Sequence, residues 1–157
     1  QILTVKNCSV SELIHNHWQQ YGRNYYSRHD YEAIPSSIAN QIFDNLSSML
    51  PILKGNKFAG SLVKEADNFS YLDPVDNSIS KNQGLRIILE DNSRVILRLS
   101  GTGTKGATLR LYFERFASPK QNLALNPQIA LKTLIVDLDD LLNITKLTKM
   151  KNPTVIT

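Results

Sequence analysis

The chain has one cysteine, Cys8, among its 157 residues, so it cannot form an internal disulfide, as is typical of a reducing compartment. It contains no apolar run of roughly eighteen residues that could cross a membrane. It also lacks an initial methionine and the apolar core of a signal peptide. These absences favour a cytoplasmic protein with no membrane partner, and we expect the sequence to be a fragment whose upstream part is missing.

Neither sign of charge is in large excess, with 18 Lys and Arg against 14 Asp and Glu. A nucleic-acid-binding protein would usually carry a longer basic face with interleaved aromatic residues, so the small excess favours a small anion instead. Part of the excess is local, because four basic residues fall in a segment that has no acidic residue: Arg94, Arg98, Lys105 and Arg110. The length suffices for one domain with a core.

Neither of two familiar phosphate-binding motifs is present in full. The Walker A pattern Gly-x-x-x-x-Gly-Lys-Ser/Thr does not occur. Residues 101–106 match the Gly-x-Gly-x-x-Gly spacing of dinucleotide-binding proteins, but residues 107–116 alternate apolar and polar as a strand does. No helix then follows the glycines to offer its N-terminus to a phosphate, so the dinucleotide interpretation fails.

Metal-binding clusters are also missing. His15 and His17 are two positions apart, which on a helix directs them to different sides. Asp137, Asp139 and Asp140 belong to a predicted helix on which adjacent positions diverge, so these carboxylates indicate a solvated face. We expect no metal site in this chain.

Glycine and hydroxyl residues are instead concentrated in one place, residues 98–110, which read RLSGTGTKGATLR. The three glycines allow positive φ and let backbone amides turn toward one point. Hydroxyl groups and guanidinium forks are donors suited to phosphate oxygens. The pattern therefore indicates a phosphate-holding loop between two strands. By spacing alone it also fits a hairpin turn whose arginines are solvated.

Periodicity predicts a helix at residues 10–21, with Ser9 or Ser11 as N-cap and Gly22 at its end. The other expected elements are strands at 24–32, 58–69, 84–90, 93–100 and 107–116, a helix from Pro35 stopped by Pro51, and a helix opened by Pro127. These elements predict an α+β fold, in which about four of the strands form an antiparallel sheet with two helices on one side. Residues 149–157 are polar and lack periodicity, which is typical of a flexible tail.

The segment Arg98–Tyr112 resembles the phosphate-binding loop in the last domain of eukaryotic phosphoglucomutases, enzymes of the α-D-phosphohexomutase family. Residues 17–32 (HWQQYGRNYYSRHDYE), 67–86 (DNFSYLDPVDNSISKNQGLR) and 153–157 (PTVIT) resemble the family in the same order. The resemblance covers essentially the whole chain. It implies that residues 1–22 end a preceding domain or form a linker helix, and that residues 23–157 form a C-terminal phosphate-binding domain with a TATA-box-binding-protein-like fold.

In the enzymes that it resembles, glucose 1-phosphate and glucose 6-phosphate are interconverted through glucose 1,6-bisphosphate, by a phosphoserine that Mg²⁺ activates. The last domain holds the phosphate that is not reacting. Carried over by motif, the phosphate-binding residues are Arg98, Ser100, Gly101, Thr102, Gly103 and Arg110.

Three further basic residues are expected to line the cleft. Arg28 and Arg23 belong to the second stretch of resemblance, although Arg28 could instead pair with Asp30 or Glu32. Lys105 stands where the family's pattern has alanine, and either strengthens phosphate capture or lies solvated at the loop tip.

The family's phosphoserine loop, Asp-Gly-Asp-Gly-Asp-type metal loop and sugar-recognition loop do not occur in this sequence. We therefore expect no catalytic residue here, no mutase activity from the chain alone, and Mg²⁺ and bisphosphate to be used only with the missing N-terminal domains. The alternative is a domain of a non-catalytic relative, a cytoskeletal or secretion-associated scaffold.

Overall fold

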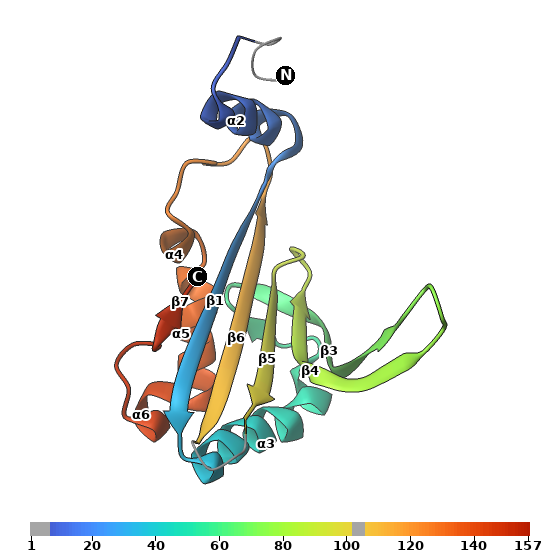
Figure 1. Ribbon diagram of the computed structural model, residues 1–157, viewed down its shortest axis with the longest axis vertical. Coiled ribbons are helices and arrows are strands. Elements are labelled where there is room, and N and C mark those ends of the chain that lie inside the picture. Colours follow the sequence, from blue (N-terminus) through green and yellow to red (C-terminus); the bar gives the residue numbers. More distant parts are fainter. Residues whose placement is uncertain (1–6, 102–105) are drawn as a thin grey trace.

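A computed structural model describes residues 7–101 and 106–157. Its strands form one antiparallel sheet in the order β2-β3-β4-β5-β6-β1-β7, with β6 between β5 and β1 (Figure 1). The strands are β1 (Arg23–Ile34), β2 (Lys57–Phe58), β3 (Ser61–Leu72), β4 (Ile79–Leu89), β5 (Arg94–Ser100), β6 (Ala107–Ala117) and β7 (Val155–Ile156). The helices are α2 (Val10–Tyr21), α3 (Ser36–Leu53), α4 (Pro127–Ala130), α5 (Lys132–Leu142) and α6 (Ile144–Thr148).

One face of the sheet is apolar and packs on helices α3 and α5. Side chains alternate along a strand, so every second residue of β4, β5 and β6 points to this face. The core accordingly joins Leu85 and Leu97, both fully buried, to Ile42 of α3 and Leu138 of α5. The alternate residues of β5 and β6 lie on the opposite face, called the open face below. The apolar core thus decides which side chains the open face presents.

Helix α2 has the predicted bounds. The Ser9 hydroxyl accepts a hydrogen bond from the Glu12 amide and the Glu12 carboxylate accepts one from the Ser9 amide, which forms a capping box. The bond from the Ser9 amide, with a second from the Ser9 hydroxyl to the same carboxylate, lowers the pKa of Glu12. At the other end Gly22 has a φ of +87°, and a Cβ there would lie 2.4 Å from the Phe116 ring. Only glycine fits where α2 meets the sheet.

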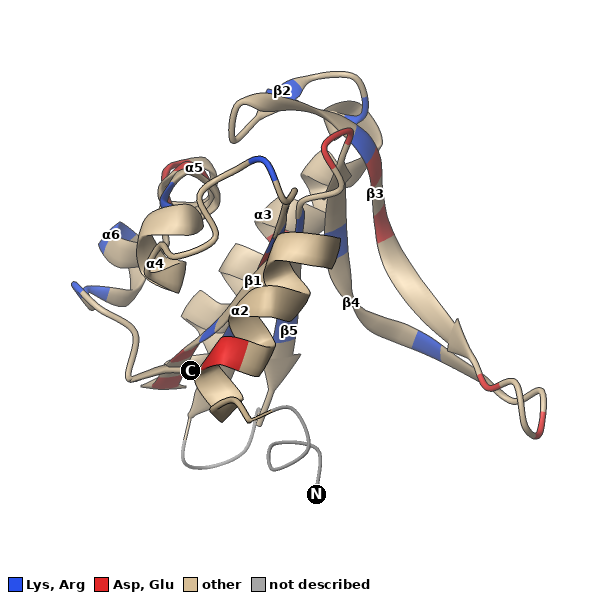
Figure 2. Cartoon of the chain, turned by 90° about the horizontal axis from the view of Figure 1, so that it is seen from above, with Lys and Arg blue, Asp and Glu red and all other residues tan. Residues whose placement is uncertain are grey.

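The α+β class and the antiparallel sheet are confirmed, but the expected number of strands is wrong. The sheet has seven strands rather than about four. The expected strand 58–69 is two strands, because Ala59 and Gly60 turn the chain between β2 and β3 with φ of +48° and +85°. Strands β3 and β4 also run past the rest of the sheet as an arm, where Tyr71 pairs with Ser80 (Figures 1 and 2).

Two helix boundaries also differ from expectation. Helix α3 continues through Pro51 to Leu53, because a proline near the last turn removes only one helical hydrogen bond while Leu50 stays buried. The helix that Pro127 opens is three short helices rather than one. It is interrupted at Leu131, with ψ near 0°, and at Asn143, in the left-handed conformation.

The polar segment 149–157 is not a free tail in this structure, because its end pairs with the outer edge of β1. The Arg28 amide donates to the Thr157 carbonyl at 2.8 Å and the Thr157 amide donates to the Arg28 carbonyl at 3.0 Å. The Thr154 amide donates to the Asp30 carbonyl at 2.8 Å. Strand β7 is too short to show periodicity, so backbone pairing alone defines it.

A buried polar chain joins β1 to α4 beneath β7. The side-chain amide of Gln128 donates from Nε2 to the Ser27 hydroxyl at 2.7 Å. The side-chain oxygen Oε1 of Gln128 lies 3.0 Å from His29 Nε2. His29 is buried and packs edge-on against the Phe113 ring. Burial lowers the pKa of His29, opposed by the bond to Gln128 and by the neighbouring Asp30 carboxylate. Burial therefore favours the neutral form of the ring.

We expect His29 to make the fold sensitive to acid. The pKa of His29 is lower in the folded chain than in the unfolded chain, where it is near 6.5. The neutral ring therefore contributes fully to the free energy of unfolding above pH 6.5, and this contribution is lost as the pH falls. The thermal midpoint, followed by circular dichroism between about pH 7.5 and about pH 5, should fall more in the wild type than in His29→Gln. An equal fall in both proteins would contradict this assignment.

Candidate phosphate site

The open face brings together three charged residues that are far apart in the sequence. Arg98 of β5 lies directly opposite Arg110 of β6, and Arg110 lies directly opposite Asp30 of β1. The three residues therefore form one row across three neighbouring strands, at the end of the sheet where β5 leads into the glycine-rich loop. Two arginines face each other here, and like charges directly opposite each other destabilise the pairing of two strands.

Asp30 is the centre of the charges in this row. Its side chain is only 3% exposed, whereas those of Arg28 and Arg110 are 38% and 41% exposed. Arg28 Nε lies 3.1 Å from Asp30 Oδ1, and Arg110 Nε lies 3.6 Å from Asp30 Oδ2. One buried carboxylate therefore forms ion pairs with two arginines. Arg28 therefore does pair with Asp30, the alternative partner that the sequence suggested. Its side chain nevertheless stays on the open face.

Arg98 extends over a glycine of the next strand. Gly84 of β4 is buried, and a Cβ placed on it would lie 2.9 Å from Arg98 Cγ, 3.0 Å from the Leu97 carbonyl and 3.3 Å from the Phe69 ring. The missing side chain at Gly84 leaves the room that the Arg98 stem uses. Among the described residues, no carboxylate lies within ion-pair distance of Arg98.

The two ends of the glycine-rich loop are fixed by the strands. Ser100 pairs with Thr108 in the last rung between β5 and β6. Gly101 and Gly106 have φ of +68° and +91°, and a Cβ on Gly106 would lie 3.0 Å from the Ala33 carbonyl carbon. The expected phosphate-binding residues Thr102 and Gly103, and also Lys105, lie outside the described residues.

Arg23 is not brought to this row. It begins β1, seven residues before Asp30, which in a strand is about 23 Å away. Its guanidinium carbon lies 4.1 Å from the centre of the Trp18 ring and 4.2 Å from that of Tyr25. It also donates to the Leu123 carbonyl at 2.6 Å. These contacts join α2, β1 and the segment before α4, which is a structural position.

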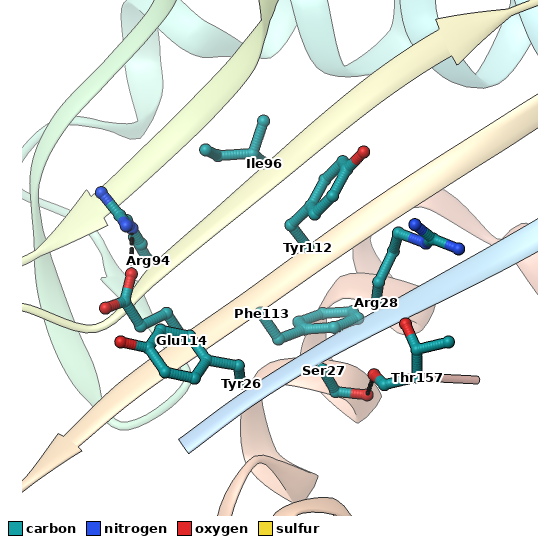
Figure 3. Close-up of a pocket in the computed structure, with 9 residues that line it drawn as sticks. All are labelled: Tyr26, Ser27, Arg28, Arg94, Ile96, Tyr112, Phe113, Glu114 and Thr157. Atoms are coloured by element: carbon teal, nitrogen blue, oxygen red, sulfur yellow. Dashed lines mark hydrogen bonds and ion pairs between the residues drawn. The ribbon is translucent and has the colours of Figure 1, made fainter. Parts of the chain in front are cut away.

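A hollow of about 360 Å³ lies beside the row on the open face. Arg28, Tyr112 and Ile96 form the next row along the same three strands, and Figure 3 shows their side chains around the hollow. At its far side Arg94 forms an ion pair with Glu114 (Figure 3). The hollow is therefore mostly apolar and aromatic, with the Arg28 guanidinium on the side that leads to Asp30.

The carboxylates of α5 have structural contacts. Asp137 accepts a hydrogen bond from the Ala59 amide at 2.9 Å, and Asp139 accepts one from the Thr145 amide at 2.7 Å. Burial raises the pKa of Tyr31 to about 12, with a smaller contribution from Asp139. In residues 7–101 and 106–157, no three His, Cys, Asp or Glu side chains gather in a way that could hold a metal ion.

Sequence reasoning treated Asp30 only as a possible partner of Arg28, and it missed Gly84. The signal for Asp30 was its position two residues after Arg28, which places both on the same face of a strand. Gly84 opens a predicted strand, where a glycine indicates close approach of another group.

In the same described ranges, no helix is long and apolar enough to cross a membrane.

The chain matches known proteins along nearly all of its length. Residues 23–154 match the family model for the C-terminal domain of phosphoglucomutase-1 of vertebrates and fungi. The chain is 47% identical over 156 residues to a phosphoglucomutase of Rhizobium radiobacter and 40% identical over 162 residues to human phosphoglucomutase-1. Each alignment covers 99% of this chain and 29% of the relative.

The fold also matches a solved structure. The open form of the exocytosis-sensitive phosphoprotein pp63/parafusin, a phosphoglucomutase of Paramecium, superimposes with a TM-score of 0.82 and 42% identity. The superposition covers 95% of this chain and 25% of the Paramecium chain. The chain thus spans less than a third of these relatives.

We expect Gly84→Ala to destabilise the fold more than Gly60→Ala. Both glycines have φ in the range that favours glycine, but only Gly84 has neighbours within 4 Å of the added Cβ. The positive φ should cost about 1–2 kcal/mol at each position, and crowding against Arg98 and Leu97 should add roughly 1–3 kcal/mol at Gly84. Urea unfolding gives both values, and equal losses would contradict the packing of Arg98 on Gly84.

Proposed function

Because the chain belongs to the family of phosphoglucomutase C-terminal domains, we propose that it holds the non-reacting phosphate while glucose 1-phosphate and glucose 6-phosphate are interconverted. The observation that carries the proposal is the Arg98–Arg110 pair, which faces across the ladder where β5 leads into the glycine-rich loop. Ser100 and Gly101 continue β5 from Arg98 into that loop. Thr102 and Gly103 join the proposed site by the family motif.

The physical reason is that two guanidinium groups in register repel each other until an anion lies between them. A phosphate offers oxygens to both forks, and each charge-assisted hydrogen bond contributes about 1.5–3 kcal/mol. Four such bonds would give about 6–12 kcal/mol before losses. Association alone costs at least about 4 kcal/mol, and ordering the loop adds to this. We therefore propose a weak site in this chain, near millimolar.

Remote binding of one phosphate would position the other end of the substrate for reaction. The glucose phosphates, the bisphosphate intermediate and the Mg²⁺ that activates the phosphoserine belong to the proposed activity of the longer protein. The described residues contain no carboxylate cluster that would fit Mg²⁺, so no residue here is assigned to it. The remaining domains of the mutase are the proposed partners, and a cytoplasmic location stays a prediction.

The second candidate is a domain of a non-catalytic scaffold. The Paramecium relative is described both as an exocytosis-sensitive phosphoprotein and as a phosphoglucomutase, so one chain of this family carries both descriptions. Phosphate binding does not separate the two functions, but mutase activity of the longer protein does.

Arg98→Ala and Arg110→Ala should each abolish detectable binding of glucose 1-phosphate and glucose 6-phosphate. Loss of one charge-assisted bond from a millimolar site raises the Kd at least about tenfold. A proton–nitrogen NMR titration of the wild type should show saturable shifts at Gly101, Gly106 and Arg110 with both phosphates. Both are expected because the clamp does not depend on which end of the sugar reacts.

Arg94→Ala is the matched control. Arg94 lies on the same face of β5, four residues or about 13 Å from Arg98, and is paired with Glu114 instead. This variant should bind like the wild type. If Arg94→Ala weakens binding as much as Arg98→Ala does, the loss reflects the net positive charge of the sheet, and the proposed phosphate site at Arg98 and Arg110 is wrong.

The chain alone should show no phosphoglucomutase activity. The phosphoserine loop and the metal loop of the family do not occur in this sequence, so the proposed site can hold a phosphate but lacks the parts that transfer it. A coupled assay with glucose 1-phosphate, glucose 1,6-bisphosphate and Mg²⁺ measures glucose 6-phosphate directly. Turnover that survives repurification and is lost in Arg110→Ala would overturn this expectation.

A further inference from the structure

We propose that Asp30 is the positioning residue of the phosphate site, acting through Arg28 and Arg110. The inference rests on the proposed function, because it says how that site is held in shape. Its basis is one carboxylate, 3% exposed, that forms ion pairs with two arginines whose side chains are more than a third exposed. The carboxylate is buried at the base of the open face, while the two arginine side chains beside it remain partly exposed.

The geometry of the two ion pairs decides what remains for a ligand. In both pairs the arginine atom that approaches Asp30 is Nε, at 3.1 Å for Arg28 and 3.6 Å for Arg110. A guanidinium has five N–H donors in a planar fork, and the Nε–H is only one of them. Among the described residues, neither Nε atom nor Asp30 Oδ1 has a hydrogen-bond partner, so the two contacts are ion pairs without a hydrogen bond. The attraction of the carboxylate therefore acts on the Nε edge of each guanidinium, and in this proposal the terminal nitrogens are the donors to phosphate oxygens.

The backbone beneath these side chains is fixed as well. Strand β7 pairs with β1 at His29 and Asp30, and the residues that flank it, Thr157 and Thr154, hydrogen-bond to the backbone of Arg28 and Asp30. On its other edge β1 pairs with β6, which places Asp30 opposite Arg110. Asp30 is thus held from both sides, and a buried carboxylate on a fixed backbone can define the direction of its partners.

The sign of the charge effect separates positioning from simple electrostatics. Asp30 is an anion beside an anion site, so by Coulomb attraction alone its neutralisation should strengthen phosphate binding. If Asp30 positions the arginines, the same change should weaken binding. Asp30→Asn keeps the shape of the side chain and removes its charge. Asp44→Asn makes the same charge change at an exposed residue of α3 and is the matched control.

The test is an NMR titration of the wild type and both variants with inorganic phosphate and with glucose 1-phosphate. We expect Asp30→Asn to raise the Kd about tenfold or more, as for one lost charge-assisted bond, and Asp44→Asn to leave it unchanged. Tighter or unchanged binding by Asp30→Asn would overturn the proposal.

A second readout does not depend on phosphate binding. The Nε–H resonances of Arg28 and Arg110 should be shifted from the other arginines in the wild type and should move toward them in Asp30→Asn. If the wild type binds no phosphate but these resonances respond, the proposed clamp is wrong while Asp30 still orients the arginines. Unmoved resonances would overturn the orienting role whatever the binding result.

Arg110→Lys covers the case in which Asp30→Asn does not fold. It retains Asp30 and the charge, but an ammonium cannot offer one edge to a carboxylate and a separate fork to an anion. We expect phosphate binding to weaken about tenfold, the loss of one charge-assisted bond. Binding equal to the wild type would show that charge alone is sufficient and would overturn the proposal.

Discussion

The register of β6 between β1 and β5 is the constraint on which the rest of the structure depends. Leu109, Leu111 and Phe113 of β6 are buried in the core beneath the helices, so Arg110 and Tyr112 must lie on the open face. A slip of one residue would exchange the two sets, burying a guanidinium and exposing the leucines. Burial of apolar area therefore fixes the position of Arg110, although its charge contributes nothing to the core.

The same register creates an electrostatic problem that the sheet resolves only in part. Arg98 and Arg110 are directly opposite each other, and Asp30 supplies one negative charge on one side of the row. Arg28 shares that carboxylate. Three cations next to one buried anion leave an excess of positive charge on the open face at the end of the glycine-rich loop. The proposed phosphate would lower the energy of this arrangement, which would account for like charges kept in register.

Local patterns in the sequence predicted the local elements. The capping residues and Gly22 defined α2, and alternation defined the β4–β5 hairpin and β6 because each has a strong signal within about ten residues. Strand β7 depends on pairing with the distant strand β1, and its two residues are too few to show a period. The role of Asp30 was missed for the same reason, since its partner Arg110 is eighty positions away.

The candidate site is therefore a property of the assembled sheet rather than of the loop motif. Residues 98–110 supply two of the cations, but the carboxylate that forms an ion pair with Arg110 comes from β1, and the space for the Arg98 stem comes from Gly84 of β4. The backbone of Asp30 is in turn held by Thr154, near the end of the chain. All four stretches that resemble the family are needed, because the open face is formed where the strands that carry them meet. The motif suggests the proposed phosphate ligand, and the sheet around it places the arginines that would bind it.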